Sequence, residues 1–383
     1  MPSRTKYGIH LLLNDDGRYP DPVHWSLSVW PEHLAYARKL VGEGGFVQEV
    51  IRLDDLNVAK WQTYLDLCAQ QHLVPIIRLA STYDHDLLQW NAPPVDSDGQ
   101  GYQIVARRYR DFLSKLRWPT TTRYVVVANE PNRGDEWGNQ PDPARYARFL
   151  VDVGTALHNA GMTVLAPSLD NYAPNSNGHL IDGYRYLDSE TFLDEMAAAN
   201  PAAFQVVDVW SAHSYPLGPF VADPSKQTFQ VDYLFGATNP RHQEPPPGVY
   251  NRGVNSYRWD LWKVAPYLGE RATSISVMIT ETGWRHRNSQ DPWAKDRVNA
   301  DVPDDRLATY VDLAYHGNDG KYPHLPTTGW TPWDDDPRVI GAVLFALDGY
   351  PRDWGHTNWL DLDQQGNVVG VSSAFRAMSQ WSG

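Results

Sequence analysis

The sequence predicts one domain, residues 1–383, with the fold of a (β/α)8 TIM barrel and long loops after the sixth and seventh strands. Segments typical of strands and of helices alternate from end to end, as in parallel βα units and not as in separate all-α or all-β domains. Eight such units can be counted, which is the number that closes this barrel. No linker rich in Ser and Gly and no low-complexity run divides the chain.

Each strand is predicted from a short apolar run that ends at a Gly, a Pro or a polar residue. The predicted strands are residues 7–13, 46–53, 74–79, 124–130, 162–167, 206–213, 277–281 and 339–347. The C-terminal ends of the strands of such a barrel meet on one face, where its chemistry is found. Side chains at these ends are therefore the first candidates for a functional site.

Apolar residues at helical spacing follow each strand and predict the helices of the eight units. The helices are expected from residue 31 onward and over residues 58–71, 103–116, 143–161, 191–200, 257–268, 304–315 and 372–378. The fourth helix has the clearest start, because Asp142 can serve as its N-cap and Pro143 suits its first position.

Two connections are longer than ordinary βα loops. They are residues 214–255, which are rich in Pro, Gly and aromatic residues, and residues 285–303. Loops of this length in a compact domain are usually functional or disordered. We expect both to form walls of a cleft at the C-terminal face of the barrel.

Charge and aromatic content restrict the classes of partner. The formal net charge of −13 and the pI near 5.4 argue against nucleic acids and anionic membranes, which require basic patches. A neutral or cationic partner suits this chain better. The 16 Trp and 21 Tyr residues serve either a large core or the stacking of sugar rings.

The chain holds a single cysteine, which excludes an intramolecular disulfide and a Cys-rich zinc site. No run of 18 apolar residues occurs, and the first residues of the chain as given show no signal-type apolar segment. We expect a soluble chain. Its native compartment and its oligomeric state are left open by the sequence.

Two predicted strands end on a glutamate. An apolar run leads into Glu281, and another leads into Glu130, where Pro131 stops the strand. An unpaired carboxylate at the edge of a core is costly, so each acid should have a partner or face a wet, functional cleft. Two carboxylates on one rim of a barrel favour general acid and base catalysis of glycosidic bond cleavage. The anomeric configuration is retained when the two carboxyl groups are about 5 Å apart and inverted when they are about 6.5 Å or more apart.

Three motifs resemble a known family. They are Asn-Glu-Pro around Glu130, Thr-Glu-Thr-Gly-Trp around Glu281, and His-Ser-Tyr from His213 to Tyr215. Together they resemble clan A of the glycoside hydrolases, the retaining (β/α)8 enzymes, and within it the family 39 group of xylosidases, iduronidases and exopolysaccharide hydrolases. The resemblance covers the barrel from its first strand to its eighth helix. It implies a carbohydrate substrate and no cofactor.

The resemblance also implies roles for individual residues. Glu281 would be the nucleophile and Glu130 the general acid/base, while Asn129 would hydrogen-bond the 2-hydroxyl of the sugar beside the bond that is cut. Arg52, at the end of the second strand, resembles the arginine that contacts and orients the nucleophile. Arg78 stands in the same Ile-Arg-Leu context at the end of the third strand, so the two roles stay open and either residue could bind substrate.

Three further residues belong to this predicted site or its surroundings. His213 and Tyr215 are expected to line the floor, with Tyr215 near enough to hydrogen-bond Glu281. His213 could instead be a satisfied core histidine. For His10, inside the first strand, the core position is the preferred interpretation.

The aromatic platform for a sugar ring is not assigned by the motifs. Clan A enzymes often place a tryptophan at the end of the eighth strand, whereas this strand ends in Phe-Ala-Leu-Asp from Phe345 onward. Trp354 or Trp359, in the loop that follows, could take over this task.

Two other functions use the same barrel. The chain could be a transglycosylase, for which Trp284, Trp293 and Trp330 would form an aromatic acceptor side. It could also be a glycan-binding protein without activity, although such a protein has no chemical need for Glu130 and Glu281.

The segment 360–368 contains alternating acids followed by a Gly, like the start of an EF-hand calcium loop. It lacks the glutamate at position 12 that such a loop requires. We therefore predict a hairpin turn here, and no metal site in the chain.

Overall fold

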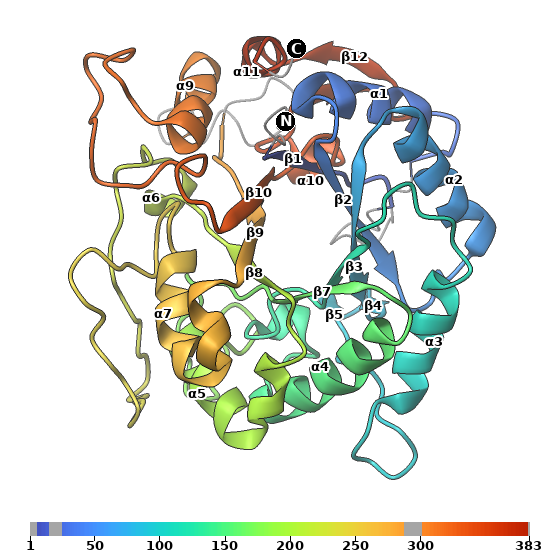
Figure 1. Cartoon of the computed structure of the whole chain (residues 1–383), viewed down its shortest axis with the longest axis vertical. Coiled ribbons are helices and arrows are strands. Elements are labelled where there is room, and N and C mark those ends of the chain that lie inside the picture. Colours follow the sequence, from blue (N-terminus) through green and yellow to red (C-terminus); the bar gives the residue numbers. More distant parts are fainter. Residues whose placement is uncertain (1–5, 15–24, 287–300, 382–383) are drawn as a thin grey trace.

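The computed structural model describes residues 6–14, 25–286 and 301–381, and in this part of the chain eight parallel strands close into a barrel (Figure 1). The strands are β1 (Tyr7–His10), β2 (Phe46–Arg52), β3 (Val74–Ala80), β6 (Tyr124–Val127), β7 (Thr163–Pro167), β8 (Val209–His213), β9 (Ser276–Thr282) and β10 (Val339–Leu344). Around the barrel their order is β1, β10, β9, β8, β7, β6, β3, β2. The predicted (β/α)8 fold is confirmed.

The main helices form a ring outside the barrel (Figure 1). They are α1 (Trp30–Val41), α2 (Val58–Gln70), α3 (Gln103–Leu113), α4 (Pro143–His158), α5 (Ser189–Ala199), α7 (Tyr257–Leu268), α9 (Asp304–His316) and α11 (Ser373–Met378). Asp142 caps α4 as predicted, because its side chain accepts a 2.9 Å hydrogen bond from the Arg145 amide. None of the helices in the described ranges is long and apolar enough to cross a membrane.

Several strands are shorter than their apolar runs. β6 ends at Val127 instead of at Glu130, because Ala128 and Glu130 have positive φ angles of 68° and 34° and leave the extended conformation. β1 ends at His10, although Leu11 and Leu13 beyond it are fully buried. Apolar residues that cover the barrel mouth therefore extend the predicted strands past their true ends.

An apolar layer fills the part of the barrel interior that is nearer the N-terminal ends of the strands. It consists of Phe46, Val74, Ile76, Tyr124, Val126, Leu165, Val209, Met278 and Val343. Because side chains alternate between the two faces of a strand, every second residue after this layer also points inward. Along β3 this places Arg78 above Val74 and Ile76, at the mouth.

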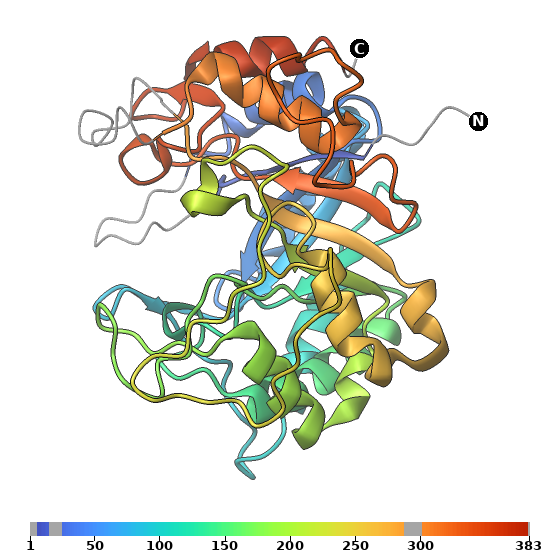
Figure 2. The same ribbon diagram turned by 90° about the vertical axis from the view of Figure 1, so that its left-hand side faces the viewer.

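Short elements lie on the C-terminal side of the barrel. β4 (Tyr83–Asp84) and β5 (Gln89–Trp90) form an antiparallel hairpin after β3, α6 (Leu217–Phe220) follows β8, and α10 (Pro351–Trp354) follows β10. Figure 2 shows the hairpin (cyan) and α6 (yellow-green) on the same, left-hand side of the barrel. This side carries the candidate site.

A buried glutamate anchors the long connection between β8 and α7. Glu190 of α5, fully buried, lies 2.9 Å from Lys263 Nζ of α7 and 2.6 Å from His242 Nδ1 of the loop. These contacts hold the loop against two helices of the ring. The other long connection, 285–303, falls mostly outside the described residues, so its role as a cleft wall stays a prediction.

The acidic tail segment forms a hairpin of β11 (Leu360–Leu362) and β12 (Val368–Val371). Asp363 Oδ1 accepts 2.9 Å hydrogen bonds from the amides of Gln365 and Asn367. This carboxylate thus stabilises the turn through the backbone. The predicted hairpin is confirmed in place of an EF-hand loop.

A buried histidine joins the first helix to the end of the barrel. His33 Nδ1 lies 2.7 Å from Asp348 Oδ2, and its Nε2 lies 2.7 Å from the Gly366 carbonyl oxygen. Both partners accept, so both ring nitrogens must donate, which only the imidazolium can do. Burial alone would lower the pKa of His33, but the hydrogen bond and charge of Asp348 raise it above its ordinary value.

We predict that His33→Phe lowers the free energy of unfolding by about 3 kcal/mol at pH 6, because it leaves the buried Asp348 carboxylate unpaired. The contribution of His33 is complete below the pKa of an unfolded histidine, about 6.5, and is lost as pH rises through the higher folded pKa. The difference between wild type and variant should therefore shrink at alkaline pH.

Urea unfolding from pH 6 to pH 9 measures this difference. His324→Phe, at an exposed histidine, is the control and should leave stability unchanged. A difference that does not vary with pH would contradict the imidazolium assignment.

Candidate active site

A cavity of about 270 Å³ opens at the C-terminal ends of the barrel strands. Its polar wall includes Arg78, Asn129, Glu130, Asp170, Tyr215 and Glu281, and its aromatic wall includes Tyr83, Trp90, Trp137, Phe220, Phe345 and Trp354. The two glutamates predicted from the strand ends therefore line one cavity.

Glu281 is held by two partners at the end of β9. Its Oε1 lies 2.5 Å from an Arg78 guanidinium nitrogen, and its Oε2 accepts a 3.0 Å hydrogen bond from the Tyr215 hydroxyl. The predicted contact of Tyr215 with Glu281 is thus present. Burial alone would raise the pKa of Glu281, but the positive charge of Arg78, followed by that of His213, lowers this pKa to about 2. The carboxylate stays ionised.

Arg52 is not the arginine that contacts Glu281, contrary to the expectation from the family resemblance. Its Nε lies 3.1 Å from Asp54 Oδ1, and it does not line the cavity. Arg78, on the next strand, makes the ion pair instead. The position of each strand around the closed barrel determines which of the two reaches Glu281.

Glu130 enters the cavity from a turn beyond β6. Its own amide donates a 3.0 Å hydrogen bond to the Ser168 carbonyl, and its φ of 34° directs the side chain away from the strand line. Only 8% of the residue is exposed. A non-glycine residue with positive φ is uncommon and is concentrated at functional sites.

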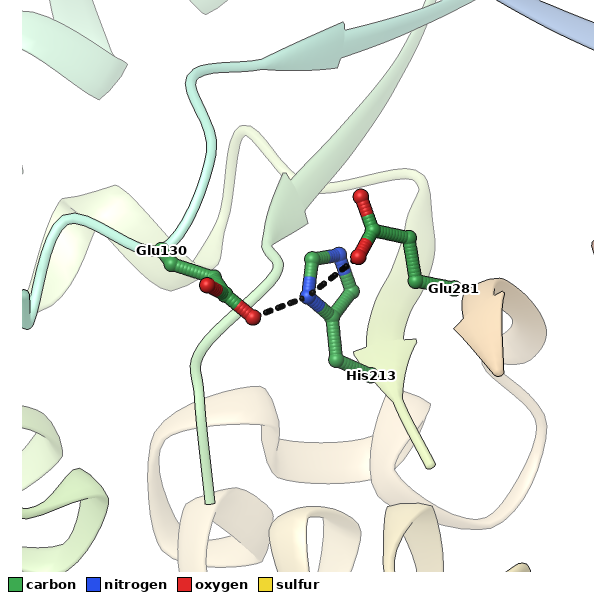
Figure 3. A group of neighbouring side chains, drawn as sticks. All are labelled: Glu130, His213 and Glu281. Atoms are coloured by element: carbon green, nitrogen blue, oxygen red, sulfur yellow. Dashed lines mark hydrogen bonds and ion pairs between the residues drawn. The ribbon is translucent and has the colours of Figure 1, made fainter. Parts of the chain in front are cut away.

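His213 connects the two glutamates (Figure 3). Its Nδ1 donates a 2.7 Å hydrogen bond to Glu130 Oε1 and lies 3.7 Å from Glu281 Oε2. Burial alone would lower the pKa of His213, but the two carboxylates, Glu281 foremost, raise it above its ordinary value. His213 is 2% exposed and is not part of the cavity lining, so it does not form the floor of the cavity as expected.

The two carboxylates are close to each other. One oxygen of Glu130, one oxygen of Glu281 and a ring nitrogen of His213 all lie within 4.8 Å of one another. Figure 3 shows the imidazole between the two side chains, with the carboxylates on either side. The value of 4.8 Å is an upper bound on the closest approach of the two carboxylates, which the sequence could not supply.

A second arginine lies on the Glu130 side. Arg133 is 3.5 Å from Glu130 Oε2 and 3.1 Å from Asp170 Oδ2, and it makes a double contact with Asp135 at 3.0 and 2.8 Å. Burial, together with the charge of Glu130, raises the pKa of Asp170 above its ordinary value. This network was not predicted from the sequence, although Arg133 follows the Asn-Glu-Pro-Asn run directly.

Asn129 lines the cavity, and its Oδ1 has no hydrogen-bond partner among the described residues. Its contact with a sugar hydroxyl stays a prediction. His10 also lines the cavity, so it is not simply a core histidine. A polar side chain near the end of a strand was the signal that could have identified it.

The tryptophans divide between cavity and core. Trp354 lines the cavity and packs edge-on against Phe345, with ring centroids 5.0 Å apart. Trp284 does not: it is 2% exposed, and its indole N–H donates to the Ala222 carbonyl at 2.8 Å. Trp359 is equally buried, so the predicted alternatives for the platform reduce to Trp354.

Two of the three proposed acceptor tryptophans, Trp284 and Trp330, do not line the cavity. The Trp330 indole N–H donates to the Leu313 carbonyl of α9, and Trp330 does not line the cavity. Trp293 lies outside the described residues. The aromatic wall includes residues that were not predicted from the sequence, notably Trp90 of the β4–β5 hairpin and Trp137. Nothing in the local sequence distinguishes them from core aromatics.

Glu130, His213 and Glu281 have the residue types and the spacing of a metal site. Each carboxylate, however, already lies beside a guanidinium group, Arg78 at 2.5 Å and Arg133 at 3.5 Å. These fixed positive charges would repel a divalent cation. The arrangement therefore fits an acid pair better than a metal centre.

No protein-family model matches the chain, and no curated protein matches it. Among solved structures, the chain is similar to a GH5_18 glycoside hydrolase from Bifidobacterium longum subsp. infantis, with 12% identity, coverage of 99% of this chain and 79% of that chain, and a TM-score of 0.51. It is also similar to GH5_18 from Streptomyces cattleya, with 14% identity, 98% and 79% coverage and a TM-score of 0.51.

The family 1 β-glucosidase from Thermotoga maritima is a further neighbour, with 11% identity, 100% and 97% coverage and a TM-score of 0.50. These neighbours are clan A glycoside hydrolases. At such low identities the similarity shows the shared barrel fold.

We predict that Arg78→Met raises the pKa of Glu281 from about 2 to above that of an ordinary glutamate, because burial is then left without its main compensating charge. Titration of the glutamate side-chain carbon by ¹³C NMR measures it. Arg52→Met, the matched control on the neighbouring strand, should leave this pKa unchanged. An equal response of the two variants would refute the assignment of Arg78.

Proposed function

We propose that this protein is a retaining β-glycoside hydrolase, which cleaves a β-linked oligo- or polysaccharide through a glycosyl-enzyme. The observation that carries the proposal is the placement of Glu130 and Glu281 in one cavity, with carboxylate oxygens within 4.8 Å. Retaining glycosidases hold their two carboxyl groups about 5–5.5 Å apart, whereas inverting enzymes leave about 6.5–9.5 Å for a water molecule.

In the first step Glu281 attacks the anomeric carbon. Its lowered pKa, about 2, supports this role, because a nucleophile must be ionised. Arg78 and Tyr215 each contact one oxygen of Glu281 and so orient the carboxylate. As the bond from carbon to Glu281 forms, the glycosidic bond breaks and Glu130 gives its proton to the leaving oxygen.

In the second step Glu130 acts as a base. It takes a proton from a water molecule, whose oxygen attacks the anomeric carbon and releases Glu281 as a carboxylate. His213 contacts both acids and is a positioning residue in this scheme: its Nδ1–H holds Glu130 Oε1 toward the centre of the site. The two displacements together retain the anomeric configuration.

The remaining wall supports a carbohydrate ligand. Trp90, Phe345 and Trp354 offer flat apolar surfaces of the kind on which sugar rings stack. The clan A barrels among the structural neighbours are consistent with this class of substrate. The residues of the motifs around Glu130 and Glu281 support a relationship to the family 39 group within the clan.

We predict that Glu281→Gln and Glu130→Gln each lower kcat/KM for a β-linked oligosaccharide by about 10⁴-fold or more. Glu130→Gln should lose far less on a dinitrophenyl glycoside, whose leaving group needs no proton, and azide should restore its turnover with a β-glycosyl azide as product. Glu43→Gln, at a side chain 73% exposed, is the control.

Proton NMR of the anomeric signals follows the reaction over a panel of β-glycans. A β-product at early times fits double displacement, whereas an initial α-product would overturn it. Sugar-to-sugar products at high acceptor concentration would assign a transglycosylase, and binding without turnover would assign a glycan-binding barrel.

We further predict that dialysis against a chelator leaves kcat/KM unchanged, because Arg78 and Arg133 provide the positive charge at the two carboxylates. Assays before dialysis, after dialysis and after addition of Zn²⁺ or Mn²⁺ test this. Loss of activity that an added metal restores would assign Glu130, His213 and Glu281 as metal ligands.

A further inference from the structure

Buried polar atoms without partners surround the cavity. They include His10 Nε2, Arg78 Nε, Ser81 Oγ, Asn129 Oδ1 and Trp137 Nε1, and their residues all line the cavity. Buried polar atoms are almost always hydrogen-bonded, to protein, water or ligand. Five such atoms around one cavity indicate that a ligand with several hydroxyl groups completes their bonding.

His10 presents an acceptor to this cavity. Its Nδ1–H donates a 2.8 Å hydrogen bond to the Leu11 carbonyl oxygen, which leaves a lone pair on Nε2 in the neutral ring. Burial, followed by the nearby charge of Arg78, lowers the pKa of His10 to about 3, so the ring is neutral at physiological pH. His10 Nε2 and Asn129 Oδ1 can thus accept a hydrogen bond from a hydroxyl but cannot bind an anion.

Trp137 presents a donor. It is 2% exposed, its indole N–H has no partner among the described residues, and Trp137 lines the cavity. The next residue fixes this segment to the β4–β5 hairpin, since the Gly138 amide donates a 2.7 Å hydrogen bond to the Trp90 carbonyl. An indole N–H can only donate, so its partner is an oxygen acceptor.

The charges of the cavity wall also favour a neutral ligand. The described lining contains four carboxylates, Glu130, Glu136, Asp170 and Glu281, but only the two arginines Arg78 and Arg133. Arg78 is paired with Glu281, and Arg133 is paired with Asp135 and Asp170. A sugar carboxylate would therefore meet net negative charge and no arginine free of an acidic partner.

We infer that the cavity selects a neutral sugar, in which hydroxyl groups donate to His10 Nε2 and Asn129 Oδ1 and an oxygen accepts from Trp137 Nε1, and that it rejects uronic acids. This inference rests on the proposed function for its kinetic test, and it names the substrate class of that same site. His10 and Trp137 are thereby substrate-binding residues that determine specificity.

The first test compares matched pairs of substrates. Aryl β-glucoside and β-galactoside are assayed beside the β-glucuronide and β-galacturonide, which differ only in the C6 carboxylate. We expect kcat/KM for the preferred neutral glycoside to exceed that for its uronide by about 100-fold, from charge repulsion in the cavity. A uronide that is cleaved as well as its neutral partner overturns the inference.

The second test compares substitutions of two buried tryptophans, one at the cavity and one away from it. Trp137 and Trp259 both bury an indole N–H without a partner, but only Trp137 lines the cavity. Trp137→Phe should lower kcat/KM for the neutral glycoside by about 3- to 10-fold, the effect of one lost neutral hydrogen bond. Trp259→Phe should leave kcat/KM unchanged.

Monodeoxy glycosides distinguish the loss of one hydrogen bond to the substrate from a general structural effect of the substitution. For the one analogue that lacks the oxygen bound by Trp137, wild type and Trp137→Phe should react equally, and His10→Phe should show the same behaviour with a different analogue. A uniform loss across all analogues in both variants would overturn the assignment of these residues.

A binding measurement separates this inference from the proposed function. Calorimetry of the Glu281→Gln protein with the neutral disaccharides and uronides needs no turnover. Selective binding of neutral sugars, together with a wild-type protein that hydrolyses none of them, would sink the proposed function and support the inference. Hydrolysis with retention but without preference for neutral sugars would do the reverse.

Discussion

The ion pair between Arg78 and Glu281 spans the mouth of the barrel. β3 and β9, which carry the two residues, lie opposite each other in the closed sheet, with three strands between them on either side. A carboxylate as buried as Glu281 would be protonated without a neighbouring cation. The guanidinium keeps Glu281 ionised, and the closed barrel holds the guanidinium in place. The candidate chemistry therefore depends on this contact.

Two glutamates in one cavity acquire different properties from their surroundings. Glu281 belongs to a strand and lies 2.5 Å from Arg78, whereas Glu130 follows its strand on a turn with positive φ and lies 3.5 Å from Arg133. His213 reaches both, at 2.7 Å from Glu130 and 3.7 Å from Glu281. Division of an acid role and a nucleophile role between like residues requires this kind of asymmetry.

The arrangement of the chain into eight βα units was predictable because it follows from local sequence patterns. Apolar runs, helical spacing and the Asp142 cap each involve residues that are near one another in sequence, and the structure bears them out. Strand ends were less accurate, because residues such as Leu11 are buried by the loops over the barrel mouth and not by sheet pairing. Burial and strand conformation are separate properties that apolarity alone does not distinguish.

The sequence by itself determined that Glu130 and Glu281 come at or just after the C-terminal ends of two strands of one barrel and must therefore meet at its C-terminal face. Only the tertiary structure decided which groups surround them. Arg52 and Arg78 share the same local sequence, and Trp284 and Trp90 are both aromatic residues beside a strand end. Their roles differ because the closed sheet turns Arg78 toward Glu281 and the β4–β5 hairpin holds Trp90 at the cavity, while Trp284 packs into the core. Long-range packing sets these directions, and no local pattern encodes them.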